Sequence, residues 1–269
     1  MNWHRISALI RKDLREVTAN KMVLLPMIVV PIVLCAFVPG ILLVVALSLD
    51  VALISGVEFF EKILPLYSIP EGLDEVADKV IFVFLNYTFV PFFMLIPIMV
   101  ASVISANSIV GEKERKTLET LLYTPITNRE FLLGKLLSSF LPAVAVTFIS
   151  FLAYFLTTNA IHYAWRQMLI VRSLIWIPAI VLLSPMVSML GLAITLLVSL
   201  RAKTYMEAQQ TAGVIVLPFL ALIVVQVMGL ITFNVLAIVI FSLLLLGLNY
   251  LILSRIGPRF SRESIISTL

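Results

Sequence analysis

"VIFVFLNYTFVPFFMLIPIMVASVISANSIV", Val80–Val110, contains no charged residue. A helix of roughly 20 apolar residues is long enough to cross the ~30 Å hydrocarbon core of a bilayer, and this run exceeds that length. Of the 269 residues in the chain, 61% are hydrophobic and only 13% are charged. Soluble domains carry about 25% charged residues. The sequence therefore predicts an all-α integral membrane protein.

Similar apolar runs occur along the whole chain, separated by short blocks of charged residues. We expect a single transmembrane domain, 1–269, with six transmembrane helices, the last two forming a tight hairpin. The expected spans are about 22–49, 80–110, 131–158, 173–200, 211–231 and 233–253. A transmembrane β-barrel would instead show alternating segments of about ten residues.

The distribution of Lys and Arg predicts how the chain is oriented. Fifteen of the nineteen Lys and Arg residues fall on one side of the six expected spans. Because positive residues favour the cytoplasmic side, we expect both termini and the segment 111–130 in the cytoplasm. The loop 50–79 is then external, and it is acidic. It either attracts cations, gates an exit, or has the ordinary composition of an exported loop.

The first 21 residues have a different pattern. Trp3, Ile6, Ile10, Leu14 and Val17 recur at helical spacing, and charged residues occupy the rest of the helix surface. This pattern predicts an amphipathic helix that lies in the membrane interface. The alternative is a basic flank of the first span whose periodicity is accidental.

The chain lacks the motifs of several enzyme classes. The only Gly-Lys pair, Gly134-Lys135, has no upstream glycine at P-loop spacing and is followed by Leu136, so we expect no ATP hydrolysis by this chain. There is no H-E-x-x-H motif, and the two histidines are far apart. We predict no catalytic residue, no metal ligand and no cofactor in the chain. The single cysteine, Cys35, is expected to serve packing.

The expected spans are almost free of charge. An ion-coupled transporter keeps ionisable residues within the membrane, whereas the polar residues here are neutral. They are Asn86, Asn107, Ser150, Thr195, Gln226 and Asn249. If the protein moves a substrate uphill, the energy is expected to come from another subunit. An ion-coupled secondary transporter or channel acting alone, and a non-transporting membrane anchor or sensor, remain as alternatives.

The segment "GEKERKTLETLLYTPITNREFLLGK", residues 111–135, is charged at its start and apolar further on. We expect Gly111 to end the second span in a turn and Thr117 to cap a short helix that stops at Pro125. The leucines of that helix share one face. Charges of both signs beside an apolar face suit a specific contact with a soluble protein better than anionic lipid.

The third span has its own start signal. Thr127 and Glu130 have the spacing of a capping box, and Ile126 and Phe131 have the spacing of the accompanying hydrophobic staple. The segment 111–130 is therefore predicted to be a rigid helical connection between two turns.

This segment resembles a known family. G-E-K-E-R-x-T-L-E-x-L-L-x-x-P is similar to the connection between the second and third spans of type 2 ABC-transporter permeases, the export-type membrane subunits. "SLRAKTYMEAQQTAGVIVLP", Ser199–Pro218, resembles the next cytoplasmic loop of that family. The suggested branch includes permeases of sodium-extrusion and drug- or peptide-resistance exporters. Many members carry Gly-Thr where this chain has Lys116-Thr117. We therefore expect the turn at this position to close differently in this chain.

The resemblance implies a function and partners. The chain would be the permease subunit of an ATP-binding cassette exporter in the plasma membrane of a prokaryote. It would work with two copies of a separate ATP-binding cassette subunit, which holds ATP and Mg, and with a second permease copy in a homodimer or a paralogous heterodimer. Apart from membrane lipid, no further partner and no nucleic acid is implied. The sequence does not indicate whether the substrate is an ion, lipid, drug, peptide or glycan.

The resemblance also implies site residues. ATPase coupling is expected at the start of the segment 111–130, and a secondary cytoplasmic contact is expected on two other segments. The coupling residues are Gly111, Glu112, Lys113, Glu114, Arg115, Lys116, Thr117, Leu118, Glu119, Leu121, Leu122 and Pro125. The secondary contact residues are Arg11, Lys12, Arg15 and Glu207.

Overall fold

The computed structural model describes residues 2–48, 62–117, 126–199 and 201–259. These residues form helices and connections, without a strand among them. Six helical stretches within them are long and apolar enough to cross a membrane. The predicted fold class, an all-α membrane protein with six spans, is confirmed.

Most of the six stretches are built from several helices in succession. The first comprises α2 (Lys21–Ile32), the π-helical turn η1 (Val33–Phe37) and α3 (Val38–Ser48). The second comprises α5 (Val76–Val83), η4 (Phe84–Thr88), α6 (Phe89–Phe93), α7 (Leu95–Ala106), η5 (Asn107–Gly111) and α8 (Glu112–Glu114). The third is the single helix α10 (Asn128–Arg166). The others are α11 (Trp176–Pro178) with η6 (Ala179–Leu183) and α12 (Ser184–Ser199), then α13 (Tyr205–Gly213) with α14 (Val216–Val227), and finally α15 (Val235–Arg259).

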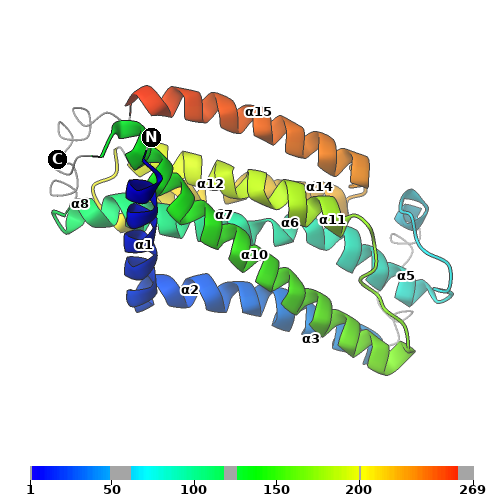
Figure 1. Ribbon diagram of the computed structural model, residues 1–269. Coiled ribbons are helices and arrows are strands. Elements are labelled where there is room, and N and C mark those ends of the chain that lie inside the picture. Colours follow the sequence, from blue (N-terminus) through cyan, green and yellow to red (C-terminus); the bar gives the residue numbers. More distant parts are fainter. Residues whose placement is uncertain (1, 49–61, 118–125, 200, 260–269) are drawn as a thin grey trace.

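The second stretch is the centre of the bundle. In its most apolar window 89% of the residues are buried, against 22% in the fifth and sixth stretches and 28% in the first and third. Helix α7 packs against both α10 and α12, and the other helices surround it (Figure 1). The charged segment therefore continues directly from the most enclosed helix of the protein.

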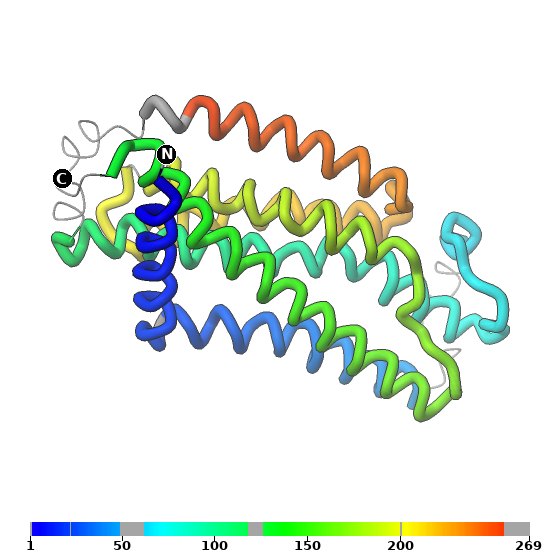
Figure 2. The backbone as a smooth tube through the Cα atoms, viewed as in Figure 1, coloured from blue at the N-terminus to red at the C-terminus, as the bar shows by residue number. Residues whose placement is uncertain are grey.

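Different elements lie at the two ends of the bundle. At one end, called the α1 end below, α1 (Trp3–Ala19) runs across the spans, and α8 and the end of α15 lie at the same end (Figure 2). At the opposite end lie η3 (Leu64–Leu66) and the start of α5. There Arg166 pairs with Glu75 and Asp78, so described parts of the acidic loop are tied to the end of α10.

Most of the neutral polar side chains within the spans have structural partners. Asn86 donates to the carbonyls of Phe82 and Ile170, at 3.0 and 2.9 Å, and accepts from the N–H of Ser173. The hydroxyls of Ser150 and Thr195 bond to carbonyls one turn earlier in their own helices. Asn86 therefore holds the connection between α10 and α11 against the second stretch, whereas Ser150 and Thr195 are satisfied within their own helices.

Helix α1 is amphipathic, and its buried face includes two of the predicted apolar positions, Ile6 and Val17. Leu9 and Asp13 complete the buried face, whereas Trp3 is 61% exposed. Helix α1 packs against α10 and α2, and this tertiary contact decides which side chains are buried. Asp13 fits on that face because its carboxylate finds partners there.

The contact between α1 and α10 depends on a glycine. A Cβ atom at Gly134 would lie 2.5 Å from Cδ2 of Leu9 and 3.3 Å from its Cβ. We expect Gly134→Ala to destabilise the protein by about 1–3 kcal/mol, the usual cost of overpacking. The measurement is the apparent Tm in detergent together with protease cleavage within α1. Gly213→Ala is the matched control, because no heavy atom lies within 4 Å of the Cβ position. Equal effects of the two changes would contradict the prediction.

Candidate functional site

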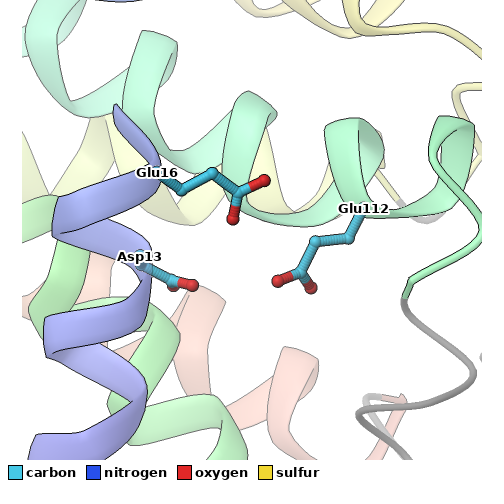
Figure 3. A group of neighbouring side chains, drawn as sticks. All are labelled: Asp13, Glu16 and Glu112. Carbon is cyan, nitrogen blue, oxygen red and sulfur yellow. The ribbon is translucent and has the colours of Figure 1, made fainter. Parts of the chain in front are cut away.

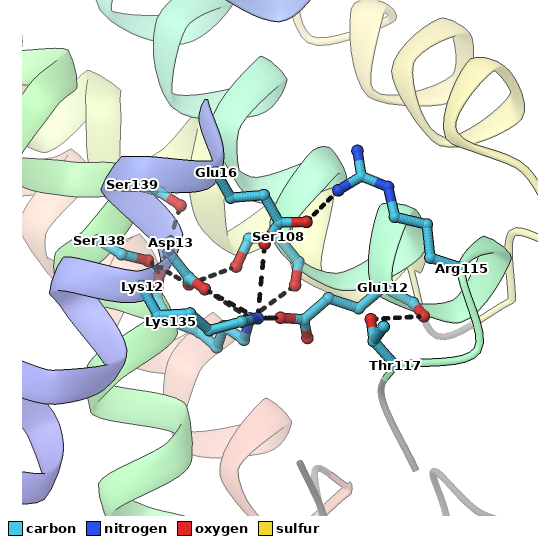
Figure 4. A network of polar contacts seen from close by, with 10 residues as sticks. All are labelled: Lys12, Asp13, Glu16, Ser108, Glu112, Arg115, Thr117, Lys135, Ser138 and Ser139. Carbon is cyan, nitrogen blue, oxygen red and sulfur yellow. Dashed lines mark hydrogen bonds and ion pairs between the residues drawn. The ribbon is translucent and has the colours of Figure 1, made fainter. Parts of the chain in front are cut away.

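A network of charged side chains joins three parts of the chain at the α1 end. Asp13 comes from α1, Glu112 from the start of α8, and Lys135 from the second turn of α10 (Figure 4). Their exposed fractions are 2%, 0% and 1%. Fully buried charges are rare unless they are paired, so their arrangement decides whether this region is stable.

Lys135 is the centre of the network. Its Nζ lies 3.1 Å from Oδ1 of Asp13 and 3.0 Å from Oε1 of Glu112, and it donates to the carbonyl of Ser108 at 2.7 Å. The second oxygen of Asp13 accepts from the hydroxyls of Ser108 and Ser138, at 2.8 and 2.9 Å. These contacts tie α1, η5 and α10 to one ammonium group.

Three more charged residues complete the network toward its surface. Lys12 pairs with Glu112 and lies 3.5 Å from Glu16, and Arg115 pairs with Glu16 (Figure 4). The network thus contains three carboxylates and three cationic side chains, and its formal charges cancel. Such balance is what allows charges to remain buried, because each ion is stabilised by an opposite one.

The three carboxylates lie together in a way that resembles a metal-ligand set. Asp13, Glu16 and Glu112 each offer an oxygen, and these oxygens lie within 4.8 Å of one another (Figure 3). However, the Nζ atoms of Lys12 and Lys135 lie among the carboxylates and neutralise them. The geometry is that of an ion-pair cluster.

The structure corrects one expectation for the start of the coupling segment. Gly111 does not form a turn: it is buried, has φ −61° and continues the helix from η5 into α8. Glu112, the next residue, is completely buried and pairs with Lys12 of α1 and Lys135 of α10. The helix therefore extends one turn past the apolar run, and these ion pairs stabilise its end.

The turn lies instead at Lys116, whose φ is +58°. The N–H of Thr117 bonds to the carbonyl of Glu112 at 3.0 Å, and the N–H of Lys116 bonds to that of Lys113 at 3.0 Å. This pair of bonds is the Schellman motif, which ends helices with a left-handed residue, most often glycine. Lys116 therefore adopts a conformation that suits glycine better than lysine.

Replacing Lys116 by glycine should therefore stabilise the turn. A non-glycine residue in the left-handed region costs roughly 1 kcal/mol, part of which glycine regains by its own flexibility in the unfolded chain. We expect Lys116→Gly to leave stability unchanged or to raise it by up to about 1 kcal/mol, and Lys116→Val to lower it by about 1 kcal/mol. Thermal unfolding in detergent checks both. A loss of stability in the glycine variant would count against this account.

The remaining described coupling residues lie at the surface and contact neighbouring segments. Glu114, Arg115, Lys116 and Thr117 are exposed. Glu114 accepts from the N–H of Tyr205 at 3.0 Å, which connects the segment to α13. Lys113 is half-buried and donates to the carbonyl of Ser199 at 3.1 Å.

The predicted secondary contact residues have mixed surroundings. Arg11 and Arg15 are exposed on α1, whereas Lys12 belongs to the network. Glu207 accepts from the N–H of Lys203 at 2.8 Å while its own N–H bonds to Thr204, so it caps α13 locally. The structure therefore brings Lys12 to the 112–115 segment, while Arg11 and Arg15 line a surface pocket of α1 together with Lys12.

The rest of the predicted segment lies partly outside the described residues. Leu118, Glu119, Leu121, Leu122 and Pro125 fall in that part. The capping box beyond them is confirmed: Thr127 accepts from the N–H of Glu130 at 3.3 Å, and Glu130 accepts from the N–H of Thr127 at 3.1 Å. Glu130 also accepts from the N–H of Asn2, which fixes the start of α1 to the start of α10.

Sequence reasoning missed Asp13, Glu16, Ser108 and Lys135. It described the spans as almost free of charge, yet Glu112 and Lys135 belong to two of the six apolar stretches. The available signal was Asp13, which stands between Leu9 and Val17 at the spacing of one helix face. A carboxylate on an apolar helix face indicates a buried partner elsewhere.

Six apolar helices and a charged network at one end define a multi-pass helical membrane protein. The family model described as "ABC-2 family transporter protein" matches residues 7–256. The chain therefore belongs to the ABC-2 transporter family, whose members are the membrane subunits, or permeases, of ABC transporters. No curated protein and no solved structure gave a match.

Proposed function

We propose that this chain is the permease of an ATP-binding cassette exporter, which moves its substrate out of the cytoplasm with ATP hydrolysed by a separate subunit. The observation that carries the proposal is that the exposed residues 114–117 lie at the end of a helical stretch that continues into the centre of the bundle. A force applied at this surface reaches α7 directly.

The network supports this role mechanically. A partner that moves α8 also moves α1 and α10, because Glu112, Asp13 and Lys135 are bound to one another and enclosed. Helix α8 extends past α1 at the end of the bundle, so it is the more accessible of the two to a soluble partner (Figure 1). The distribution of Lys and Arg favours the cytoplasm for this end.

The partners follow from the proposal. Two ATP-binding cassette subunits, each with ATP and Mg, would bind at the α1 ends of two permease chains, which form a homodimer or a paralogous heterodimer. Exposed apolar side chains on α14 and α15, such as Leu217, Val224, Leu236 and Leu243, provide surface for lipid or for the second permease. The plasma membrane of a prokaryote is the proposed location.

The test is reconstitution in liposomes with and without the ATP-binding subunit encoded nearest to this gene. The proposal expects the two proteins to co-purify and expects transport only when both are present with ATP and Mg. Transport by the permease alone, driven by an ion gradient, would instead support a secondary transporter. Stable association without any transport would support a membrane anchor or sensor.

A further inference from the structure

A groove of about 620 Å³ lies beside the coupling segment at the α1 end. Its walls come from the junction of α1 and α2, from η5 and α8, and from the start of α13. Gly111, Glu114 and Arg115 border it. Of the charged network, only Arg115 is among the residues that line this groove.

The polar part of the groove is suited to an anion. Asn107 lines it, is only 4% exposed, and has no hydrogen-bond partner for its side-chain amide among the described residues. Lys21 also lines it and forms no ion pair with a described carboxylate. Lys21 is the first residue of α2, and the N–H groups of Val23 and Leu24 in its first turn already bond to the carbonyl of Asn20. The positive charge on this side of the groove is therefore the ammonium of Lys21 itself.

The apolar part of the groove continues onto the outside of α2. Val23, Leu25, Pro26 and Met206 line the groove next to the polar groups. From Leu25 onward, an exposed apolar stripe follows helical spacing along α2 and η1: Leu25, Ile28, Val29, Ile32 and Val33. A ligand with a polar head in the groove therefore has a continuous apolar surface for a tail.

We propose that this groove binds the phosphate headgroup of an anionic phospholipid, whose acyl chains lie along the exposed stripe of α2. The phosphate oxygens accept from the ammonium of Lys21 and from the side-chain amide of Asn107, both of which line the groove. A free phosphate ion would use the polar groups but leave the apolar stripe unused. A phospholipid fits both features at once, because its phosphate pairs with Lys21 and its acyl chains cover the exposed apolar stripe. A protein segment would need an anionic side chain and an apolar face at the same spacing.

The position of the groove gives the bound lipid a consequence. Gly111, Glu114 and Arg115 form its border, so an occupied groove contacts the coupling segment directly. This consequence rests on the proposed function, whereas the binding itself does not. Binding is therefore measured on the purified permease alone.

The experiment is native mass spectrometry of the full chain in detergent, titrated with phosphatidylglycerol or phosphatidylcholine of the same acyl chains. We expect a single tight phosphatidylglycerol site that phosphatidylcholine does not fill equally. Lys21→Gln should weaken phosphatidylglycerol binding by about tenfold, the loss of one charge-assisted contact. Because Lys21 is exposed, this variant should keep its fold, which thermal unfolding checks.

The matched control is Lys203→Gln, which removes an exposed lysine at the same end of the bundle but outside the groove. It should leave phosphatidylglycerol affinity within about twofold, since Lys203 does not line the groove and an exposed charge is screened by salt. Equal losses in the two variants, or equal affinities for the two lipids, would overturn the proposal. So would glycerol phosphate binding as tightly as the whole lipid, which would indicate a free-anion site.

Discussion

Replacing Lys135 by methionine is expected to destabilise the protein by about 3–5 kcal/mol, the usual cost of removing one partner from a buried ion pair. Asp13 and Glu112 would lose the ammonium at 3.1 and 3.0 Å, and both carboxylates would stay enclosed. Methionine has a similar volume, so the loss is of charge rather than of packing. At roughly 2–4 °C per kcal/mol for a chain of this size, the apparent Tm in detergent should fall by roughly 6–20 °C.

A second variant distinguishes the effect of the lost charge on stability from the effect of the changed side-chain shape. Asp13→Asn combined with Lys135→Met removes one carboxylate and one cation, so the network stays neutral. We expect this double variant to recover at least half of the lost Tm. As a control, Lys203→Gln removes an exposed lysine outside the network and should change Tm little. If the double variant loses as much Tm as the two single variants lose together, charge balance is not what stabilises the network.

Reversing the charges of Glu114 and Arg115 is expected to abolish substrate-stimulated ATP hydrolysis by the complex while membrane insertion stays intact. Both side chains are exposed at the end of α8, where the proposed partner would bind. Reversed charges there place like charges against the partner, which costs several kcal/mol. The measurement is ATPase activity of the reconstituted complex, with insertion checked by membrane fractionation.

Arg115 also has an internal partner, Glu16, and a further variant separates the two roles. Arg115→Glu alone loses the internal pair and changes the exposed charge. Adding Glu16→Arg restores the pair with its polarity reversed and leaves the exposed charge reversed. If coupling stays lost in this double variant, Arg115 acts on the partner. If coupling returns, Arg115 acts through α1, and the direct contact is refuted.

The number of spans and the start of the third one could be predicted from the sequence because both are local signals. Long apolar runs separated by charges define membrane helices, and Thr127 with Glu130 defines a cap within four residues. Confirmation of the family followed from the same residues, since the matched region covers 7–256.

The network could not be predicted in this way, because its members are far apart in the chain. Asp13 and Lys135 are separated by 122 residues, and Lys12 and Glu112 by 100. Each looked like an ordinary charge in the flank of a span, and only the fold shows that they meet. The burial of Leu9 and Asp13 on α1 has the same origin, since packing against α10 decides it.

The turn at Lys116 illustrates a different limit. The sequence pattern favoured Gly111 as the turn residue, because glycine accepts left-handed φ values more readily than lysine. The bonds within Glu112–Thr117 place the turn at the lysine instead. Local preference was outweighed by the burial of Glu112, which keeps the helix intact for one more turn.

The buried charges bear on the alternative of an ion-coupled transporter. Ionisable residues do occur within two of the apolar stretches, contrary to the prediction from sequence. Their charges cancel, however, and they lie where α1 crosses the end of the bundle rather than midway along it (Figure 1). This position favours a mechanical role over a path for a coupling ion.

The enclosure of the second stretch has a consequence for how such a protein diversifies. With 89% of its apolar window buried, this stretch has almost no surface left for a transported molecule. Substitutions there are expected to change stability first. If the protein acts as proposed, recognition of the transported compound then falls to the outer helices. Selection for a new transported compound can therefore act on the outer helices while the buried second stretch stays the same.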